Sequence, residues 1–228
     1  MINYLKACTC VALLIALSAC SSTPKSSQEK VSQQEAESFL KKYCSIFNAK
    51  KLLDQELAGE ILVRSNTKEF KGQYPASIHF SKDKTFSLEV TNLIGGTVLM
   101  LKGDPTAVEV VSPGRPQYNR KGISQYMGLS IPMFEELLHG DLPCPDSSKV
   151  KVEGNEIIVQ DSGLEWRIER SDKDSGAVPV RTRILDQGKV KIEMWIESWN
   201  VAASYAEKVK VHTAEGDLKW SWRSREIK

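Results

Sequence analysis

The sequence predicts a mainly β protein, in which a curved antiparallel sheet of about 10–11 strands forms an incomplete barrel covered by a few α-helices. From Gly59 onward, apolar and polar residues alternate with a period of two, as they do in strands with one buried face. Short turn-rich pieces separate these runs, which is typical of an antiparallel meander. A flat open sheet of this width would expose its apolar face, so strong curvature is expected.

The first twenty residues resemble a targeting segment. Lys6 precedes a short apolar stretch, residues 11–17, which is too short to span a membrane. The sequence Leu17-Ser18-Ala19-Cys20 resembles the lipobox of bacterial lipoproteins, in which a signal peptidase cleaves before the cysteine and the thiol carries a diacylglyceryl group. We therefore expect residues 1–19 to be a signal peptide and Cys20 to be the site of lipid attachment. An ordinary secretory signal is the alternative.

Residues 20–31 are expected to form a lipidated flexible tether, because they are rich in Ser, Lys and Pro and lack apolar periodicity. Ser21 follows the cysteine, and in lipoproteins of this kind a residue other than aspartate there implies delivery to the outer membrane. We expect Ser21 to sort the protein to that membrane, where its lipid holds it facing the periplasm. Two or more acyl chains on one residue make such anchoring stable.

Composition and motifs argue against several classes of function. The formal net charge of +2 gives no indication of a nucleic-acid partner. No P-loop, dinucleotide-binding fingerprint or Cys/His pair with metal-ligand spacing is present, and His79, His139 and His212 are isolated from one another in sequence. We expect no catalytic residue, no metal and no cofactor, and a monomer that is not an enzyme.

Two cysteines remain once Cys8 and Cys10 leave with the signal peptide and Cys20 carries lipid. Cys44 and Cys144 could form a disulfide in an oxidising periplasm, where closing a loop of ~100 residues would add several kcal/mol of stability. Two buried free thiols are the alternative.

Two helices and a further stretch of helical character near residues 123–127 are predicted. Ser32 and Glu35 form a capping-box pattern, and a broad apolar face at helical spacing follows them. We expect this face to pack on the core rather than lie on a membrane, because its polar side is not a basic strip. Ser130 and Pro132 begin a second, short helix that Gly140 ends.

One predicted hairpin connection carries two aliphatic residues, Leu93 and Ile94, where a turn normally carries polar ones. Asn92 and the pair Gly95-Gly96 supply the tolerance for positive φ that a tight reversal needs. The two aliphatic side chains are therefore not needed for turning. Either they are tucked under a neighbouring loop, or they form an apolar tip that needs a lipid or protein surface.

Three blocks of the sequence resemble the LolB family of outer-membrane lipoprotein receptors. In residues 86–101 a strand ends in Thr-Asn and returns at once into another strand, as at the Thr-Asn-Pro-Leu-Gly turn of the family. Residues 128–143 resemble the family's short helix segment. Residues 165–168 and 191–199 resemble its late strands.

The resemblance spans roughly residues 33–200, so we expect a LolB-like half-barrel domain over residues 32–200. Residues 201–228 exceed the usual length of the family and are expected to form a C-terminal extension, with an added hairpin as one form it could take.

The resemblance also implies a function. LolB-like proteins receive lipoproteins from a soluble periplasmic carrier of the LolA kind and release them into the outer membrane, so this carrier and its lipoprotein cargo are the expected partners. The protruding leucine of the family falls on Ile94 and the adjacent proline on Leu93. We therefore expect Leu93, Ile94 and Gly95 to form a membrane-insertion loop.

An apolar cavity for acyl chains is implied as well, and a dense core is the alternative. The expected lining consists of inward-facing strand residues: Ile61, Val63, Ile78, Phe80, Phe86, Leu88, Val90, Val108, Val110, Trp166, Ile168, Ile192 and Met194. The alternative function is a structural or interaction lipoprotein that uses the same barrel without lipid transfer.

Overall fold

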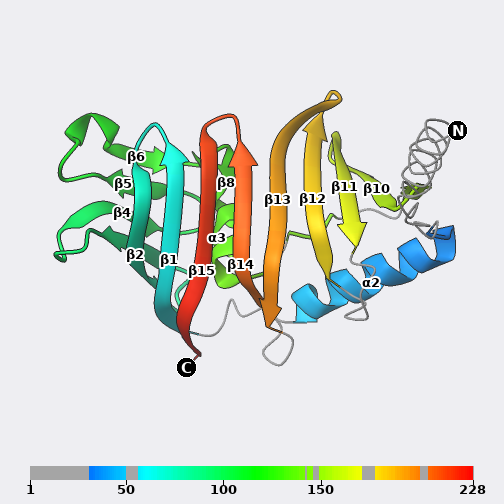
Figure 1. Cartoon of the computed structure of the whole chain (residues 1–228), viewed down its shortest axis with the longest axis horizontal. Helices are drawn as coiled ribbons and strands as arrows, with labels where there is room; N and C mark the ends of the chain where they lie inside the picture. Colours follow the sequence, from blue (N-terminus) through cyan, green and yellow to red (C-terminus); the bar gives the residue numbers. More distant parts are fainter. Residues whose placement is uncertain are drawn as a thin grey trace, which may run out of the picture. The chain divides into compact units, whose positions relative to one another are not determined.

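The computed structural model confirms the predicted fold class. Thirteen strands of the described residues pair antiparallel in one sheet, and Figure 1 shows that this sheet is curved. Its outer strands, β6 (Arg120–Ile123) and β9 (Val150–Glu153), lie at opposite ends of the strand order. The sheet that the structure describes is therefore not closed into a barrel.

Residues 31–228 form one compact unit. Its described parts are residues 31–49, 56–141, 143–145, 149–170, 178–200 and 205–227. The expected signal peptide, Cys20, Ser21 and all of the expected tether except Val31 lie outside the described residues.

The first six strands are neighbours in the sheet in the order in which they occur in the chain. They are β1 (Leu57–Thr67), β2 (Lys71–Phe80), β3 (Phe86–Thr91), β4 (Thr97–Gly103), β5 (Val108–Val111) and β6. The 3-10 helix η2 (Pro116–Tyr118) lies between β5 and β6, and the short strands β7 (Gln125–Tyr126) and β8 (Leu129–Ser130) form a separate pair. The helical character expected near residues 123–127 is therefore wrong, because β6 and β7 occupy that stretch.

The later strands form a second block of sequential neighbours. They are β9, β10 (Glu156–Asp161), β11 (Leu164–Arg170), β12 (Pro179–Asp186), β13 (Lys189–Asn200), β14 (Tyr205–Thr213) and β15 (Gly216–Ile227). The total exceeds the predicted 10–11 strands partly because β6 is short and its residues, Arg-Lys-Gly-Ile, show no apolar alternation.

The C-terminal hairpin corrects the domain boundary expected at residue 200. Strands β14 and β15 do form a hairpin, but β15 pairs along the whole of β1, from Leu57 opposite Ile227 to Thr67 opposite Gly216. The hairpin therefore lies in the middle of the sheet and joins the two blocks. Residues 205–227 are therefore part of the domain and not an extension of it.

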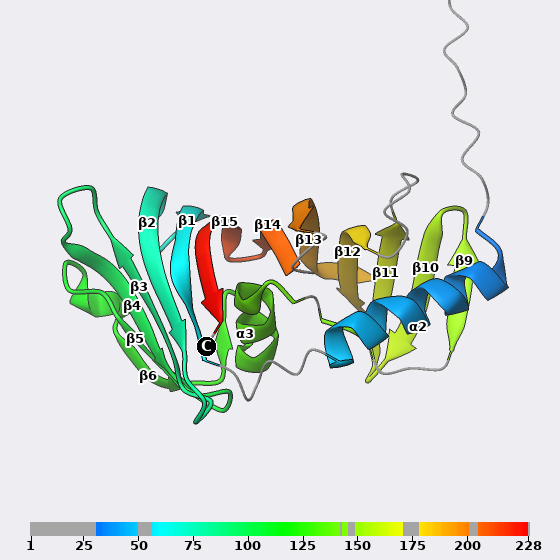
Figure 2. The same ribbon diagram turned by 90° about the horizontal axis from the view of Figure 1, so that it is seen from below.

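Two α-helices lie on the same side of the sheet (Figure 2). Helix α2 (Gln33–Ala49) begins with the predicted capping box, in which the Ser32 backbone N–H donates to Glu35 Oε2 at 2.8 Å and the Glu35 N–H donates to Ser32 Oγ at 3.2 Å. Its apolar face, which includes Phe39 and Tyr43, is buried in the core. Neither described helix has the length and apolar character needed to cross a membrane.

Cys44 and Cys144 are joined by a disulfide, with their Cα atoms 5.6 Å apart. The bond ties α2 to the segment that follows the second helix, α3 (Ile131–His139). The hydroxyl of Tyr43 donates a hydrogen bond to the Pro143 carbonyl at 3.0 Å and reinforces the same contact.

Helix α3 begins and ends where the sequence predicts. The Ser130 side chain accepts a hydrogen bond from the Met133 N–H, Pro132 lies in the first turn, and Gly140 ends the helix in the left-handed conformation with φ of 81°. The Gly140 carbonyl accepts a hydrogen bond from the Ala206 N–H at 2.7 Å, which fixes the end of α3 against β14.

Helix α3 also buries two titratable side chains. Burial, together with the carboxylates of Glu136 and Asp104, raises the pKa of Glu135 to about 7. Burial, together with the Arg225 cation, lowers the pKa of His139 to about 4, and the His139 ring packs against Phe80 with ring centroids 3.7 Å apart. Burial therefore favours the uncharged form of both side chains.

We predict that reduction of the Cys44–Cys144 bond lowers the free energy of unfolding by about 2–5 kcal/mol, because the unfolded chain regains the entropy of a long loop. Denaturant unfolding with and without a reductant measures this difference. A double variant, Cys44→Ser with Cys144→Ser, serves as the control, and a reductant should leave its free energy of unfolding unchanged. Identical midpoints for the oxidised and reduced protein would show that the bond contributes nothing.

We also predict opposite pH dependences for variants of the two buried groups on α3. Below pH 6.5 the unfolded state protonates His139 while the folded state stays neutral down to about pH 4, so the stability from this group is lost as pH falls. Above pH 4.5 the unfolded state ionises Glu135 while the folded state keeps its proton up to about pH 7, so the stability from this group is lost as pH rises.

The two effects nearly cancel between pH 4.5 and 6.5. Relative to the wild type, His139→Gln should therefore lose stability as pH rises through this window, and Glu135→Gln should lose it as pH falls, each by about 1.4 kcal/mol per pH unit. Denaturant unfolding of the three proteins across the window measures the differences. Parallel curves would contradict the assignment.

Candidate functional site: an apolar cavity and an exposed loop

A small apolar cavity lies between α3 and the part of the sheet where the first and last strands meet. Its volume is about 10 Å³, which is about the space of one water molecule. The lining comes from four strands of the main sheet, from α3, and from Phe70 and Tyr126: Val63, Phe70, Leu88, Val90, Leu99, Leu101, Tyr126, Phe134, Leu138, Leu218 and Trp220. Every member is apolar or aromatic, so the cavity offers no chemistry beyond apolar contact.

Three of the thirteen residues predicted to line an acyl cavity line this one: Val63, Leu88 and Val90. The other ten are all buried in the core and do not line it: Ile61, Ile78, Phe80, Phe86, Val108, Val110, Trp166, Ile168, Ile192 and Met194. The alternation of residues correctly placed these side chains on the inward face. It does not distinguish a wall of a cavity from a packed contact.

Sequence reasoning missed most of the remaining lining for identifiable reasons. Leu99 and Leu101 follow the inward alternation of β4 and could have been included. Phe134 and Leu138 lie four residues apart on one face of α3, a spacing that predicts a shared contact surface. Phe70 precedes β2 in a turn, where no period of the sequence signals its burial.

A group of polar side chains closes one end of the curved half of the sheet. Glu69, in the turn between β1 and β2, pairs with Arg120 at the start of β6 and accepts a hydrogen bond from the Tyr126 hydroxyl at 3.1 Å. The Glu69 backbone carbonyl accepts a hydrogen bond from Arg115 Nη1 at 2.8 Å. The sheet is thus curved enough for the β5–β6 connection to contact the β1–β2 turn, and this end of the half-barrel is called the mouth below.

The loop between β3 and β4 projects at the same end of the sheet, because β1, β3 and β5 run parallel to one another in the antiparallel order. Leu93 is 92% exposed and Ile94 is 93% exposed, the largest values among the large hydrophobic residues described. Of the two arrangements that the sequence left open, the structure has the exposed tip.

Asn92 holds this tip in a defined conformation. Its side-chain Oδ1 accepts hydrogen bonds from the Ile94 N–H at 3.1 Å and the Gly96 N–H at 2.8 Å. Its backbone N–H donates to the Gly96 carbonyl at 2.8 Å, and Gly95 adopts a positive φ of 84°. The hydrogen bonds fix the backbone of the turn, so exposure of the two side chains is built into the turn and not a consequence of fraying.

An open groove of about 460 Å³ runs beside the tip, lined by Leu93, Ile94 and Asn92 on one side and by the start of β2, Gly72–Tyr74, on the other. The Tyr74 hydroxyl donates to the Lys71 carbonyl at 2.8 Å, so its ring is fixed across this part of β2. The groove places the apolar tip next to the β1–β2 turn.

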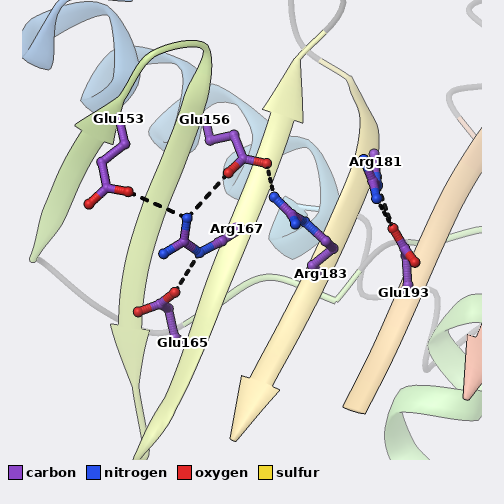
Figure 3. Close-up of polar contacts among 7 residues, drawn as sticks. All are labelled: Glu153, Glu156, Glu165, Arg167, Arg181, Arg183 and Glu193. Atoms are coloured by element: carbon purple, nitrogen blue, oxygen red, sulfur yellow. Dashed lines mark hydrogen bonds and ion pairs between the residues drawn. The ribbon is translucent and has the colours of Figure 1, made fainter. Parts of the chain in front are cut away.

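The face of the sheet that the helices do not cover carries ion pairs between strands (Figure 3). Across β11 and β12, Arg167 and Arg183 are directly opposed, and Glu156 pairs with both of them. Arg167 also pairs with Glu153 at 3.4 Å and with Glu165 at 2.5 Å. The same strands turn buried residues such as Trp166 and Ile168 toward the helix-covered face, so that face carries the apolar side chains.

The described residues contain no group of three or more His, Cys, Asp or Glu side chains that could hold a metal ion. His212 Nδ1 lies 2.9 Å from Asp217 Oδ1 at the surface, His79 lies 4.0 Å from Glu56, and His139 is buried on α3. The three histidines lie on three different elements: β2, α3 and β14.

No protein-family model and no curated protein sequence matches this chain. Among solved structures, a LolA superfamily protein from Nitrosomonas europaea is similar over 85% of this chain and 93% of its own, with 11% identity and a TM-score of 0.49. A DUF1329 family protein from Desulfovibrio piger is similar over 84% of this chain and 92% of its own, with 12% identity and a TM-score of 0.46.

The Mycobacterium tuberculosis lipoprotein LppX is similar over 84% of this chain and 94% of its own, with 9% identity and a TM-score of 0.33. At these identities and TM-scores, similarity alone assigns neither a family nor a ligand to this chain.

Proposed function

We propose that this protein is an outer-membrane-anchored lipoprotein that accepts lipoproteins from a periplasmic carrier and helps to insert them into the outer membrane. In this proposal the acyl chains of the cargo occupy the apolar space under α3, and the Leu93–Ile94 tip contacts the membrane during release. The lipobox around Cys20 supports the anchor, and Ser21 supports the choice of membrane.

The observation that carries the proposal is the exposed Leu93–Ile94 tip. A turn that is hydrogen-bonded through Asn92 presents two aliphatic side chains to solvent at more than nine-tenths of their full exposure. Soluble proteins rarely expose adjacent large apolar side chains to this extent unless those side chains contact a lipid or protein surface. A lipid anchor would place such a tip next to a bilayer.

The cavity must enlarge for cargo to bind. At about 10 Å³ it is far below the ~300–1,000 Å³ of pockets that hold organic ligands. Phe134 and Leu138 of α3 fill the space between the strands, so displacement of α3 is the movement that would open it. The Ser130 and Gly140 caps mark the two ends of the segment that would move.

A cavity that opens in this way suits transfer rather than storage. Each buried CH₂ of an acyl chain contributes about 0.8 kcal/mol in hydrocarbon. Binding an acyl chain in the protein first requires displacement of Phe134 and Leu138, and the lost packing subtracts from the free energy gained on binding. Burial of the same chain in a bilayer has no such cost, so release into the membrane is downhill without nucleotide hydrolysis.

We predict that Ile94→Glu leaves the fold intact and lowers insertion of a carrier-bound lipoprotein into outer-membrane vesicles about tenfold or more, because a carboxylate that enters the bilayer costs a few kcal/mol. Thermal unfolding and an insertion assay on the same sample measure the two effects.

Ile227→Glu is the matched control, because Ile227 is a half-exposed aliphatic residue at the far end of β15. It should insert lipoproteins as the wild type does. Normal insertion by Ile94→Glu would remove the assigned role of the tip.

The alternative is a structural or interaction lipoprotein whose interior is filled by side chains, and the small volume of the cavity favours it. The two functions differ in whether an acyl chain can reach the space under α3. We predict that a photoactivatable fatty acid labels the wild type at Phe134, Leu138 or the facing strands, and that Phe134→Ala increases labelling while lowering the free energy of unfolding by about 3–5 kcal/mol.

Ile168→Ala serves as the control for loss of stability alone, since Ile168 is fully buried and does not line the cavity. It should destabilise the protein by about 2–5 kcal/mol without raising the labelling. No labelling of either the wild type or Phe134→Ala would favour the alternative function.

A further inference from the structure

We propose that the mouth of the half-barrel recognises the surface of an anionic lipid bilayer, through Lys68, Lys71 and Arg115 placed around the Leu93–Ile94 tip. This inference deepens the proposed function, on which it rests, by naming the class of lipid that the tip meets. Three chain segments carry it: residues 66–73, 91–97 and 112–120, here called the mouth turns.

Contacts already described bring the three mouth turns together. Arg115 Nη1 donates to the Glu69 carbonyl at 2.8 Å, which joins the β5–β6 connection to the β1–β2 turn. The groove beside the tip is lined by Leu93 and Ile94 on one side and by Gly72 and Gln73 on the other. Since Lys71 precedes Gly72 directly, the tip and the basic turn lie within one side-chain length of each other.

The charge of the mouth turns is strongly positive for their size. They contain four basic side chains and one carboxylate, that of Glu69, which gives a formal charge of +3. Glu69 is already paired with Arg120. Lys68, Lys71 and Arg115 are exposed, and within the described part of the chain neither lysine has an ion-pair partner.

Acidic groups outside the mouth turns include Glu89 of β3, whose Oε1 accepts a hydrogen bond from Thr97 Oγ1 at 2.5 Å, and Glu215 in the turn between β14 and β15, on the side of β1 away from the tip. Asp217 in the same region is paired with His212 at 2.9 Å. On the opposite face of the sheet, basic groups such as Arg167 and Arg183 are paired with glutamates. The mouth therefore combines unpaired cations with an apolar tip.

An apolar tip with cations around it matches the interface of an anionic membrane. The two aliphatic side chains would lie at the level of the acyl chains, while long lysine and arginine side chains reach the headgroup phosphates. Each cation near an anionic surface contributes about as much as a fivefold change in binding, and this attraction falls off within a Debye length.

The test uses the mature chain, residues 20–228, carrying Cys20→Ser and produced without the signal peptide, so that neither an acyl anchor nor the apolar signal segment masks binding by the mouth. Co-flotation is measured with vesicles of phosphatidylcholine alone and of phosphatidylcholine mixed with anionic phosphatidylglycerol. We expect binding to the anionic vesicles only, weakened by added salt. The triple variant Lys68→Gln, Lys71→Gln, Arg115→Gln should bind them about 100-fold more weakly, and Ile94→Glu should also lose binding.

The matched control is Lys82→Gln, Lys151→Gln, Arg223→Gln, which removes the same charge at exposed positions away from the mouth. It should bind anionic vesicles as the parent does. Equal binding to neutral and anionic vesicles, equal weakening by both triple variants, or no effect of the mouth substitutions would overturn the inference.

Acyl labelling of the mouth variant separates this inference from the proposed function. If the fatty acid labels the mouth variant as it labels the wild type, and the mouth variant binds anionic vesicles as its parent does, only the proposed preference for anionic lipid is wrong. Absence of labelling in the wild type would remove the proposed function, whatever the vesicles show.

Discussion

The pairing of β1 with β15 is the interaction on which the rest of the structure depends. It runs the length of both strands, with one bulge at Glu60, and joins a block of six strands to a block of seven. Without it β1 and β15 would each be an edge strand with a long row of unpaired backbone N–H and C=O groups. The cavity also exists because of it, since Val63 of β1 lies opposite Trp220 of β15 and both belong to its lining. Strands β1 and β15, which are far apart in the chain and neighbours in the sheet, therefore form one wall of the site.

Local features of the sequence predicted local features of the structure. The period of two gave most strands and the inward face, the Ser32 and Glu35 pair gave the start of α2, and Gly140 gave the end of α3. The β1–β15 ladder was not predictable in the same way, because alternation within a strand does not specify its partner, and the two strands are joined only through the whole domain.

The cavity was only partly predictable for a related reason. Its lining combines strands from both ends of the chain with Phe70 from a turn and Tyr126 from a two-residue strand.

Helix α3 carries both the side chains that fill the cavity and the polar groups that are costly to bury. Phe134 and Leu138 contribute apolar packing, while Glu135 and His139 have lost much of their hydration, as the shifts of both pKa values indicate. Displacement of α3 would return the two polar groups to water. Part of the packing lost on opening would thus be offset within the same nine-residue helix, whereas movement of a strand would also break its backbone pairing in the sheet.

The position of the Glu69 group bears on the orientation of the protein at a membrane. Glu69, Arg120 and Tyr126 close the mouth just beside the exposed tip, while the face with the Arg167 and Arg183 ion pairs is polar. If the tip enters a bilayer, the strands stand with their mouth end toward the lipid. Tyr126 lines the cavity and donates a hydrogen bond to Glu69, so in the proposed transfer an acyl chain leaving from under α3 would pass Tyr126 to reach the membrane. The Glu69–Arg120 pair is only partly buried, with 15% of the Glu69 and 38% of the Arg120 side chain exposed, so such a chain would leave the cavity past charges that stay in contact with water.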